Sequence, residues 1–206
     1  CEVVTVGIDG GGLDDLLGFC VLGREAGTAH WLAWCKAWAH PIALERRKSE
    51  APKIRDFAVD GDLTLVARIG QDVDEVADIV AKIDASGLLD KVGVDPVGIG
   101  AIVDALEARG IMQDRIVGIS QGWRLTGAIK TAERRLAEGA LLHAGAPLMA
   151  WCVSNAKVEP LGNAVKITKQ AAGTAKIDPL MALLNAVSLM ALNPASTAVS
   201  GELLVV

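Results

Sequence analysis

Three aspartates in the sequence stand where a carboxylate can do chemistry. Asp9 ends an apolar, β-branched run and precedes three glycines, Asp95 ends a second short apolar run, and Asp178 opens a helical stretch. An acid at the end of a buried strand is held rigidly and still faces solvent, and glycines beside it leave room for a metal or a phosphate. Each acid also has an ordinary explanation, namely a glycine turn after Asp9 and an Asp-Pro helix cap at Asp95 and at Asp178.

The three acids taken together predict a divalent metal site. If the strands that end at Asp9 and Asp95 are parallel neighbours, their carboxylates meet at one sheet edge, with the strands about 4.8 Å apart. A late helix packed on the sheet can bring Asp178 to the same edge. Carboxylates so close repel one another unless a proton or a cation intervenes, and their hard oxygens suit Mg²⁺ or Mn²⁺. Two such ions can hydrolyse a phosphodiester without a histidine or a nucleophilic side chain.

Further charged residues can extend this site. Asp15 lies in the link after the first strand and is a candidate accessory ligand, although Asp14 and Asp15 there also suit a turn. Lys169 or Lys176 can steady the scissile phosphate or the attacking water. Basic side chains also lie off the buried stripe of a predicted helix, where a solvated face and a ridge for DNA phosphates are equally good interpretations: Arg124, Lys130 and Arg134.

The composition indicates a single globular chain with ample core. It has 206 residues, 51% of them hydrophobic and 22% charged, which suits one large domain or a domain with an appended lobe. The formal charge of −5 argues against a general nucleic-acid coat but leaves room for an enzyme with acids at a metal site. Four cysteines without a CxxC pair predict reduced core residues. No apolar run predicts a membrane span or a signal peptide.

The elements that must position the acids follow from hydrophobic periodicity and turn residues. Short glycine-bearing links predict an antiparallel meander of the first strand with strands over 16–25 and 28–38. The middle of the chain predicts a βαβ unit, in which the strand over 91–95 runs parallel to a strand over 115–119. Other predicted elements are a surface helix over 43–57, a strand over 63–69 and helices near 73–80 and 99–106.

The last third of the chain predicts the helix that carries Asp178. Before it, the pattern indicates a long helix over 125–136, a helix over 148–157 and a strand over 163–169 that forms one arm of a hairpin over the site. A Gly-Ala linker at 171–174 reads as mobile, and the tail at 194–206 shows little pattern.

This order of elements is similar to the ribonuclease H-like fold, an α/β fold with a three-strand antiparallel meander, added parallel strands and helices on both faces. Four local stretches resemble the nuclease half of tailed-phage terminase large subunits, over nearly the whole chain. They are GIDGGGLDD at 7–15, GVDP at 93–96, ISQGW at 119–123 and KIDPLMA at 176–182.

The resemblance implies a metal-dependent DNA endonuclease that cuts concatemeric viral DNA during genome packaging. It also implies that the enzyme uses two Mg²⁺ or Mn²⁺ ions. The family's metal acids match Asp9, Asp95 and Asp178, and Asp15 matches a further acid of some relatives. The implied partners are double-stranded DNA, a portal, a small terminase subunit and the capsid, with no membrane. The implied location is the cytoplasm of an infected bacterium or of one carrying a prophage.

The resemblance also implies that residues 1–206 are one nuclease domain, a C-terminal piece of a larger ATPase–nuclease. No GxxxxGK[ST] phosphate-binding loop occurs in the sequence. Two alternatives stay open at this point. A sugar-kinase or actin-like ATPase also begins with a strand, an acid and a glycine turn, and a non-catalytic packaging module could keep the fold without the chemistry.

Overall fold

The computed structural model describes residues 1–170 and 175–197 and contains a seven-stranded mixed sheet. Its first three strands are β1 (Val3–Gly10), β2 (Leu16–Arg24) and β3 (Trp31–Ala39), and they pair antiparallel in chain order. Strand β1 is buried along its length up to Gly10, as expected of an apolar central strand. The predicted antiparallel meander is therefore confirmed.

Parallel strands complete the sheet on both sides of this meander. Strand β5 (Leu89–Val94) pairs with β1, and β6 (Ile116–Gly118) pairs with β5, both in parallel. Two short strands, β4 (Leu63–Leu65) and β7 (Leu141–His143), pair in parallel with opposite ends of β3. The mixed sheet of the ribonuclease H-like class is thus present as predicted.

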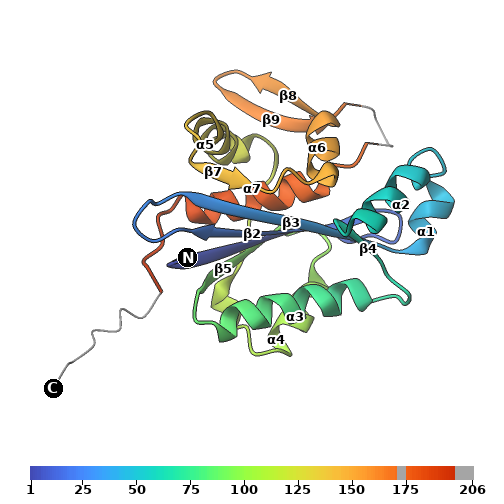
Figure 1. Cartoon of the computed structure of the whole chain (residues 1–206), viewed down its shortest axis with the longest axis horizontal. Coiled ribbons are helices and arrows are strands. Elements are labelled where there is room, and N and C mark those ends of the chain that lie inside the picture. Colours follow the sequence, from blue (N-terminus) through green and yellow to red (C-terminus); the bar gives the residue numbers. More distant parts are fainter. Residues whose placement is uncertain (171–174, 198–206) are drawn as a thin grey trace.

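Helices cover both faces of the sheet (Figure 1). On one face lie α3 (Gln71–Ala85) and α4 (Gly100–Glu107). On the other face α7 (Asp178–Met190) lies against the sheet, with α5 (Thr126–Ala137) and α6 (Pro147–Ser154) beside and above it.

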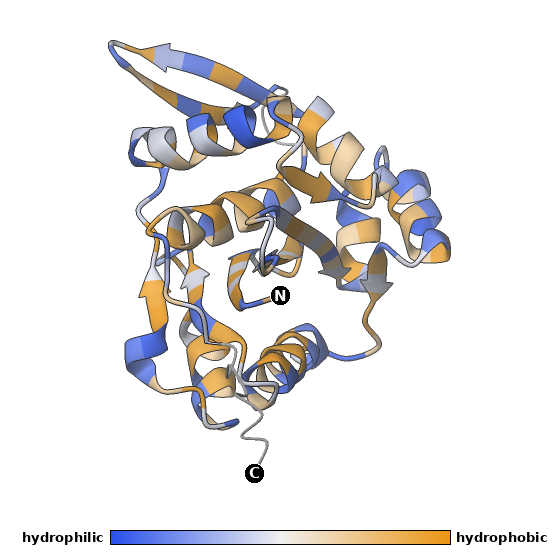
Figure 2. Ribbon diagram, turned by 60° about the vertical axis from the view of Figure 1, so that its left-hand side comes forward, coloured by the Kyte–Doolittle hydropathy of each residue, from blue (hydrophilic) through white to orange (hydrophobic). Residues whose placement is uncertain are grey.

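Smaller elements occupy the periphery. A hairpin of β8 (Ala156–Leu161) and β9 (Ala164–Lys169) projects from the α5 side, and its residues alternate between hydrophilic and hydrophobic along the ribbon (Figure 2). The helices α1 (Pro41–Arg46) and α2 (Ala51–Asp60) lie near β4, and two short 3₁₀ helices are η1 (Gln113–Arg115) and η2 (Gly122–Leu125). No helix in the described ranges is long and apolar enough to cross a membrane.

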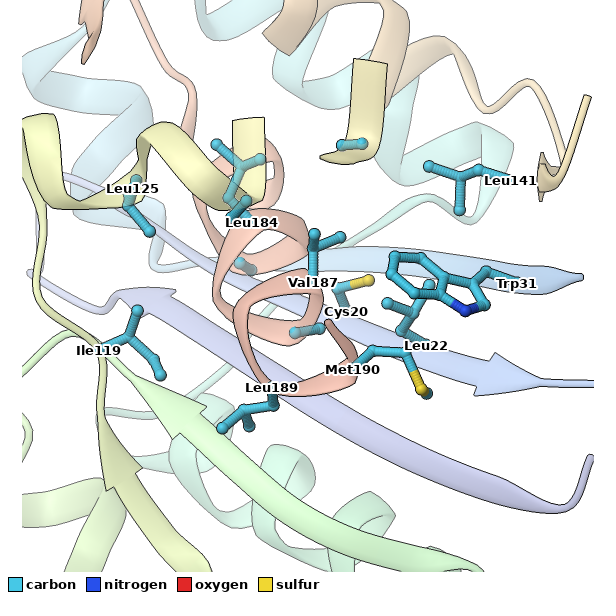
Figure 3. Close-up of a cluster of buried hydrophobic side chains, with 14 of the residues drawn as sticks. Cys20, Leu22, Trp31, Ile119, Leu125, Leu141, Leu184, Val187, Leu189 and Met190 are labelled. Atoms are coloured by element: carbon cyan, nitrogen blue, oxygen red, sulfur yellow. The ribbon is translucent and has the colours of Figure 1, made fainter. Parts of the chain in front are cut away.

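Helix α7 is the centre of the core on its face of the sheet. Its buried side chains Leu184, Val187 and Met190 lie in one cluster with Cys20 and Leu22 of β2 (Figure 3). Apolar area removed from water stabilises the fold by about 25 cal/mol per Å², so this cluster fixes α7 on the sheet. The first residue of the same helix is Asp178, and the core therefore also fixes the position of a candidate site residue.

Several predicted elements differ from the structure. The single helix predicted over 43–57 is two helices, α1 and α2, because Pro52 lacks an N–H and fits only the first turn of a new helix. The strand predicted over 63–69 ends at Leu65. The helix predicted over 148–157 ends at Ser154, where the chain turns into β8 to begin the hairpin.

The cysteine prediction holds in part. All four cysteines are free, and Cys20 and Cys152 are buried core residues, whereas Cys35 is half-buried and Cys1 is exposed. Residues 194–197 lie outside any helix or strand, as predicted for the start of the tail. The predicted linker at 171–174 and the tail from 198 onward lie outside the described residues.

Candidate active site

The parallel pairing of β1 and β5 brings two of the three acids to one sheet edge. Ile8 pairs with Val94, so Asp9 and Asp95 are the next residues on adjacent strands at the same end. Asp95 does not cap α4, which begins five residues later at Gly100. Instead, its Oδ1 accepts a hydrogen bond of 2.9 Å from the Val97 N–H, an Asx turn that leaves the carboxylate half-buried at the edge.

Two glycines without side chains let α7 approach the same edge. Gly18 is the partner of Asp9 across β1 and β2, and a Cβ atom added there would lie 2.4 Å from the Asp178 carbonyl carbon. A Cβ at Gly7 would lie 1.9 Å from the Ala182 carbonyl oxygen. The backbone of α7 therefore rests directly on β1 and β2, with Asp178 next to Asp9.

Burial and mutual repulsion make this edge electrostatically unusual. Asp9 is 9% exposed, and burial first, then the charges of Asp178, Asp95 and Asp15, raise its pKa from 3.8 to about 8. Asp178 is 4% exposed, and burial and the charge of Asp15 raise its pKa to about 7. Such shifts mean that at neutral pH Asp9 mostly keeps its proton, and Asp178 is divided between its protonated and charged forms, unless a cation takes the place of the proton.

A hard divalent cation fits these donors. In the described part of the chain, no three His, Cys, Asp or Glu side chains form a ready-made metal cage. The Oδ2 atom of Asp178 is nevertheless buried and has no hydrogen-bond partner among the described residues. A buried polar atom of this kind usually has a partner, and a metal ion can serve as one. Buried carboxylate oxygens of this kind suit Mg²⁺ or Mn²⁺, and Asp178 is not a helix cap, since Ile177 takes that position.

Lys176 is buried next to the acids and is paired with Asp15. It is 1% exposed, and its Nζ donates to the Asp15 carboxylate and, at 3.1 Å, to the Asp14 carbonyl oxygen. Burial by itself would raise the pKa of Asp15, but the hydrogen bond and charge of Lys176, together with Lys169, lower it. Lys176 therefore lies inside the protein as a structural counter-charge, and Asp15 is already compensated by it.

Lys169 is a second basic residue close to the acids. It is the last residue of β9, and its charge opposes the raised pKa values of both Asp9 and Asp178. The strand predicted over 163–169 is indeed one arm of a hairpin, and this hairpin carries Lys169 to the site. A lysine here can hold a phosphate oxygen as a point charge.

The other predicted DNA-binding residues lie on η2 and α5. The Arg124 guanidinium lies 5.5 Å from the centre of the Trp123 ring, Lys130 is exposed, and Arg134 is exposed and paired with Glu138 at 2.7 Å. Among the described residues, no hydrogen bond or ion pair joins these three basic side chains to the acids.

Two polar residues that the sequence did not single out support the site. Asn185 of α7 is fully buried and donates to the Ile8 carbonyl oxygen at 2.9 Å, one residue before Asp9. Its Oδ1 accepts from the Gln121 Nε2 at 3.0 Å, so the loop after β6 is tied to the same point. In the sequence, Asn185 stands out as a polar residue within an apolar helix, and that pattern could have indicated its buried role. Gly7 and Gly18 inside β1 and β2 could likewise have indicated that another backbone lies close to the sheet.

The sheet order, an antiparallel meander extended by parallel strands with helices on both faces, is that of the ribonuclease H-like class. The family model described as terminase large subunit, endonuclease domain, matches residues 2–193, and the chain therefore belongs to that family. This match places the chain with terminase nucleases and not with sugar-kinase or actin-like ATPases. A comparison with curated protein sequences finds no significant match.

Solved structures show the same fold. The HK97 bacteriophage large terminase is 22% identical with a TM-score of 0.74, over 92% of this chain and 40% of that chain. The large terminase nuclease from the thermophilic phage G20c is 18% identical with a TM-score of 0.56, over 90% of this chain and 81% of that one. The same nuclease with bound magnesium is 18% identical with a TM-score of 0.52, over 90% and 80%.

Proposed function

We propose that this chain hydrolyses the phosphodiester backbone of double-stranded DNA with divalent metal held by Asp9, Asp95 and Asp178. The observation that carries the proposal is the convergence of three acids at the ends of β1, β5 and the start of α7, with an unpartnered buried oxygen on Asp178. The magnesium bound by the G20c nuclease supports a divalent ion in this fold.

Each residue of the site has a role in this proposal. Asp9 and Asp178 supply buried ligand oxygens, and Asp95 supplies an oxygen from the open side of the edge. Two Mg²⁺ or Mn²⁺ ions bound there would lower the pKa of a water and stabilise the leaving 3′ oxygen. Lys169 holds the scissile phosphate, and Lys176 balances the charge of Asp15 beside the ligands.

The biological setting is proposed from the family. The chain spans 40% of the length of the HK97 large terminase. We propose that it acts as the nuclease domain of a longer ATPase–nuclease that cuts concatemeric viral DNA during packaging. Its partners in this setting are the portal, the small terminase subunit and the capsid, in the cytoplasm of an infected bacterium or of one carrying a prophage.

A plasmid-cutting assay tests the proposal. The protein should nick or linearise supercoiled plasmid with Mg²⁺ or Mn²⁺ and stop in EDTA. Each of Asp9→Asn, Asp95→Asn and Asp178→Asn should lower the rate about a hundredfold or more, because each removes several kcal/mol of metal-borne transition-state stabilisation.

The matched control is Asp56→Asn, which removes an exposed acid on α2. It should cut like the unchanged protein, and circular dichroism should show all four variants folded. Wild-type rates in any one folded site variant would remove that residue from the metal set.

A further inference from the structure

One exposed aromatic residue follows the loop that leaves the sheet beside Asp95, and the metal site gives it no role. Trp123 is 54% exposed, and the Arg124 guanidinium lies 5.5 Å from its ring centre. We infer that Trp123 and Arg124 form a platform that stacks on an unpaired base of the DNA next to the cut site. This inference rests on the proposed nuclease function and specifies the DNA structure that the site takes.

The loop that presents the platform is held at both ends. Before it, the Gln121 Nε2 donates to the Ile119 carbonyl oxygen at 2.9 Å and to Asn185 at 3.0 Å. After the platform, Leu125 is buried, and the Thr126 hydroxyl donates a hydrogen bond to the Val165 carbonyl oxygen of β9 at 2.8 Å. An aromatic ring that is held rigidly in solvent loses little entropy when a ligand stacks on it.

The same contacts place the platform close to the metal edge. The Ile119 N–H donates to the Val94 carbonyl oxygen at 2.8 Å, so this loop starts beside Asp95. Gln121 is joined through Asn185 to the Ile8 carbonyl oxygen, one residue before Asp9. Trp123 follows Gln121 by two residues, so its Cα lies within about 7 Å of the Gln121 Cα.

The chemistry of the pair selects for an open base. An indole ring offers a flat apolar face on which any nucleobase can stack, and an arginine beside it adds attraction for the base or its phosphate. Inside a paired duplex both faces of each base are covered by its neighbours, so the indole can stack only where the stack of bases is interrupted. The ligand class is therefore DNA with a gap, a frayed end or a melted segment.

Binding of two fluorescent DNA molecules in EDTA tests the inference without any cutting. One is a fully paired duplex, and the other has the same sequence with a short single-stranded gap. The unchanged protein should bind the gapped DNA more tightly. Trp123→Ala should weaken gapped binding about 5- to 100-fold and paired binding less than about twofold, whereas Trp123→Phe should keep most of the gapped affinity.

The matched control is Trp34→Ala, because Trp34 on β3 is 45% exposed and packs edge-on against Phe19, away from this loop. It should change neither affinity. A fluorescent base analogue in the gap should be quenched by the unchanged protein and not by Trp123→Ala.

Equal affinity of Trp123→Ala and the unchanged protein for gapped DNA overturns the inference, and so does an equal loss on both DNAs. Because the assay contains EDTA, its outcome is separate from plasmid cutting. A protein that cuts plasmid while Trp123→Ala binds normally keeps the nuclease proposal and loses this one.

Discussion

At the scale of single residues, the site is a balance between buried acids and two lysines. Asp9 and Asp178 have raised pKa values because burial penalises their charged forms and other acids face them. Lys169 and Lys176 offset part of that charge but leave the Asp178 Oδ2 without a partner. A cation that enters this edge therefore competes with protons for the same oxygens.

This competition predicts a pH-dependent stabilisation by magnesium. In the metal-free protein Asp9 has a pKa of about 8 when folded, against 3.8 ordinarily, so its proton favours the folded state. That contribution is complete below about pH 4 and is lost as pH rises through about 8. Mg²⁺ replaces the proton, so the rise in melting temperature on adding Mg²⁺ should be small near pH 6 and grow through pH 8.

Thermal unfolding in Mg²⁺ and in EDTA across this pH range measures the effect. Asp9→Asn should stabilise the metal-free protein at pH 8 and flatten the magnesium response. If Mg²⁺ raised the melting temperature by the same amount at every pH, protons and metal would not compete for Asp9.

The Lys176–Asp15 pair predicts a stability effect that an exposed pair lacks. Lys176→Met leaves a half-buried carboxylate without its counter-charge and should lower the free energy of unfolding by about 1–3 kcal/mol, measured by denaturant titration. The control, Lys157→Met, breaks the more exposed pair with Glu159 and should cost less than about 1 kcal/mol. Equal stability of the two variants would contradict the structural role of Lys176.

At the scale of elements, the decisive contact is that of α7 on β1 and β2. Its apolar face packs on the sheet, and the missing side chains of Gly7 and Gly18 allow the backbones to touch. Asn185 adds a buried hydrogen bond to β1. The position of Asp178 beside Asp9 is thus a consequence of helix packing.

Gly7→Ala tests this packing directly. Its Cβ would lie 1.9 Å from a backbone oxygen of α7, so the helix must shift, and the protein should lose about 1–3 kcal/mol or more of stability and its magnesium response. Gly127→Ala is the control, because this α5 position has open space and alanine favours a helix by up to about 1 kcal/mol over glycine. Denaturant titration should separate the two, and equal stability would show that α7 does not need the glycine.

At the scale of the whole molecule, an acidic protein must attract DNA through a local basic surface. The formal charge is −5, so phosphate contacts have to come from particular exposed residues. Lys130 is exposed on α5, whereas the charge of Arg134 is already offset by Glu138.

Lys130→Ala should therefore reduce the slope of log affinity against log salt concentration by about one, as expected for one lost phosphate contact. Arg134→Ala should change the slope less. DNA binding measured over a series of salt concentrations checks both variants. An unchanged slope for Lys130→Ala would place the DNA path away from α5.

Local pattern was enough to predict the antiparallel meander and the βαβ unit, and it showed that Asp9 and Asp95 would meet if their strands were parallel neighbours. Alternation, apolar runs and glycine turns act over a few residues, and the rule that parallel neighbours end at one edge needs only the strand order. The same local signals could not exclude that Asp95 caps a helix, because that depends on where α4 starts after Gly98.

Tertiary structure alone decided which polar and charged groups face each other. Lys176 and Asp15 are 161 residues apart in the chain, and Asn185 and Ile8 are 177 apart. A lysine can contact DNA only if no other element covers it, and it becomes a buried counter-charge if one does. Hydrophobic periodicity in the sequence does not show which element will cover it. The sequence by itself determined which residues are the acids and most of the sheet. The packing of α7 on Gly7 and Gly18 determined how deeply Asp9 and Asp178 are buried. Burial in turn sets their affinity for protons and metal.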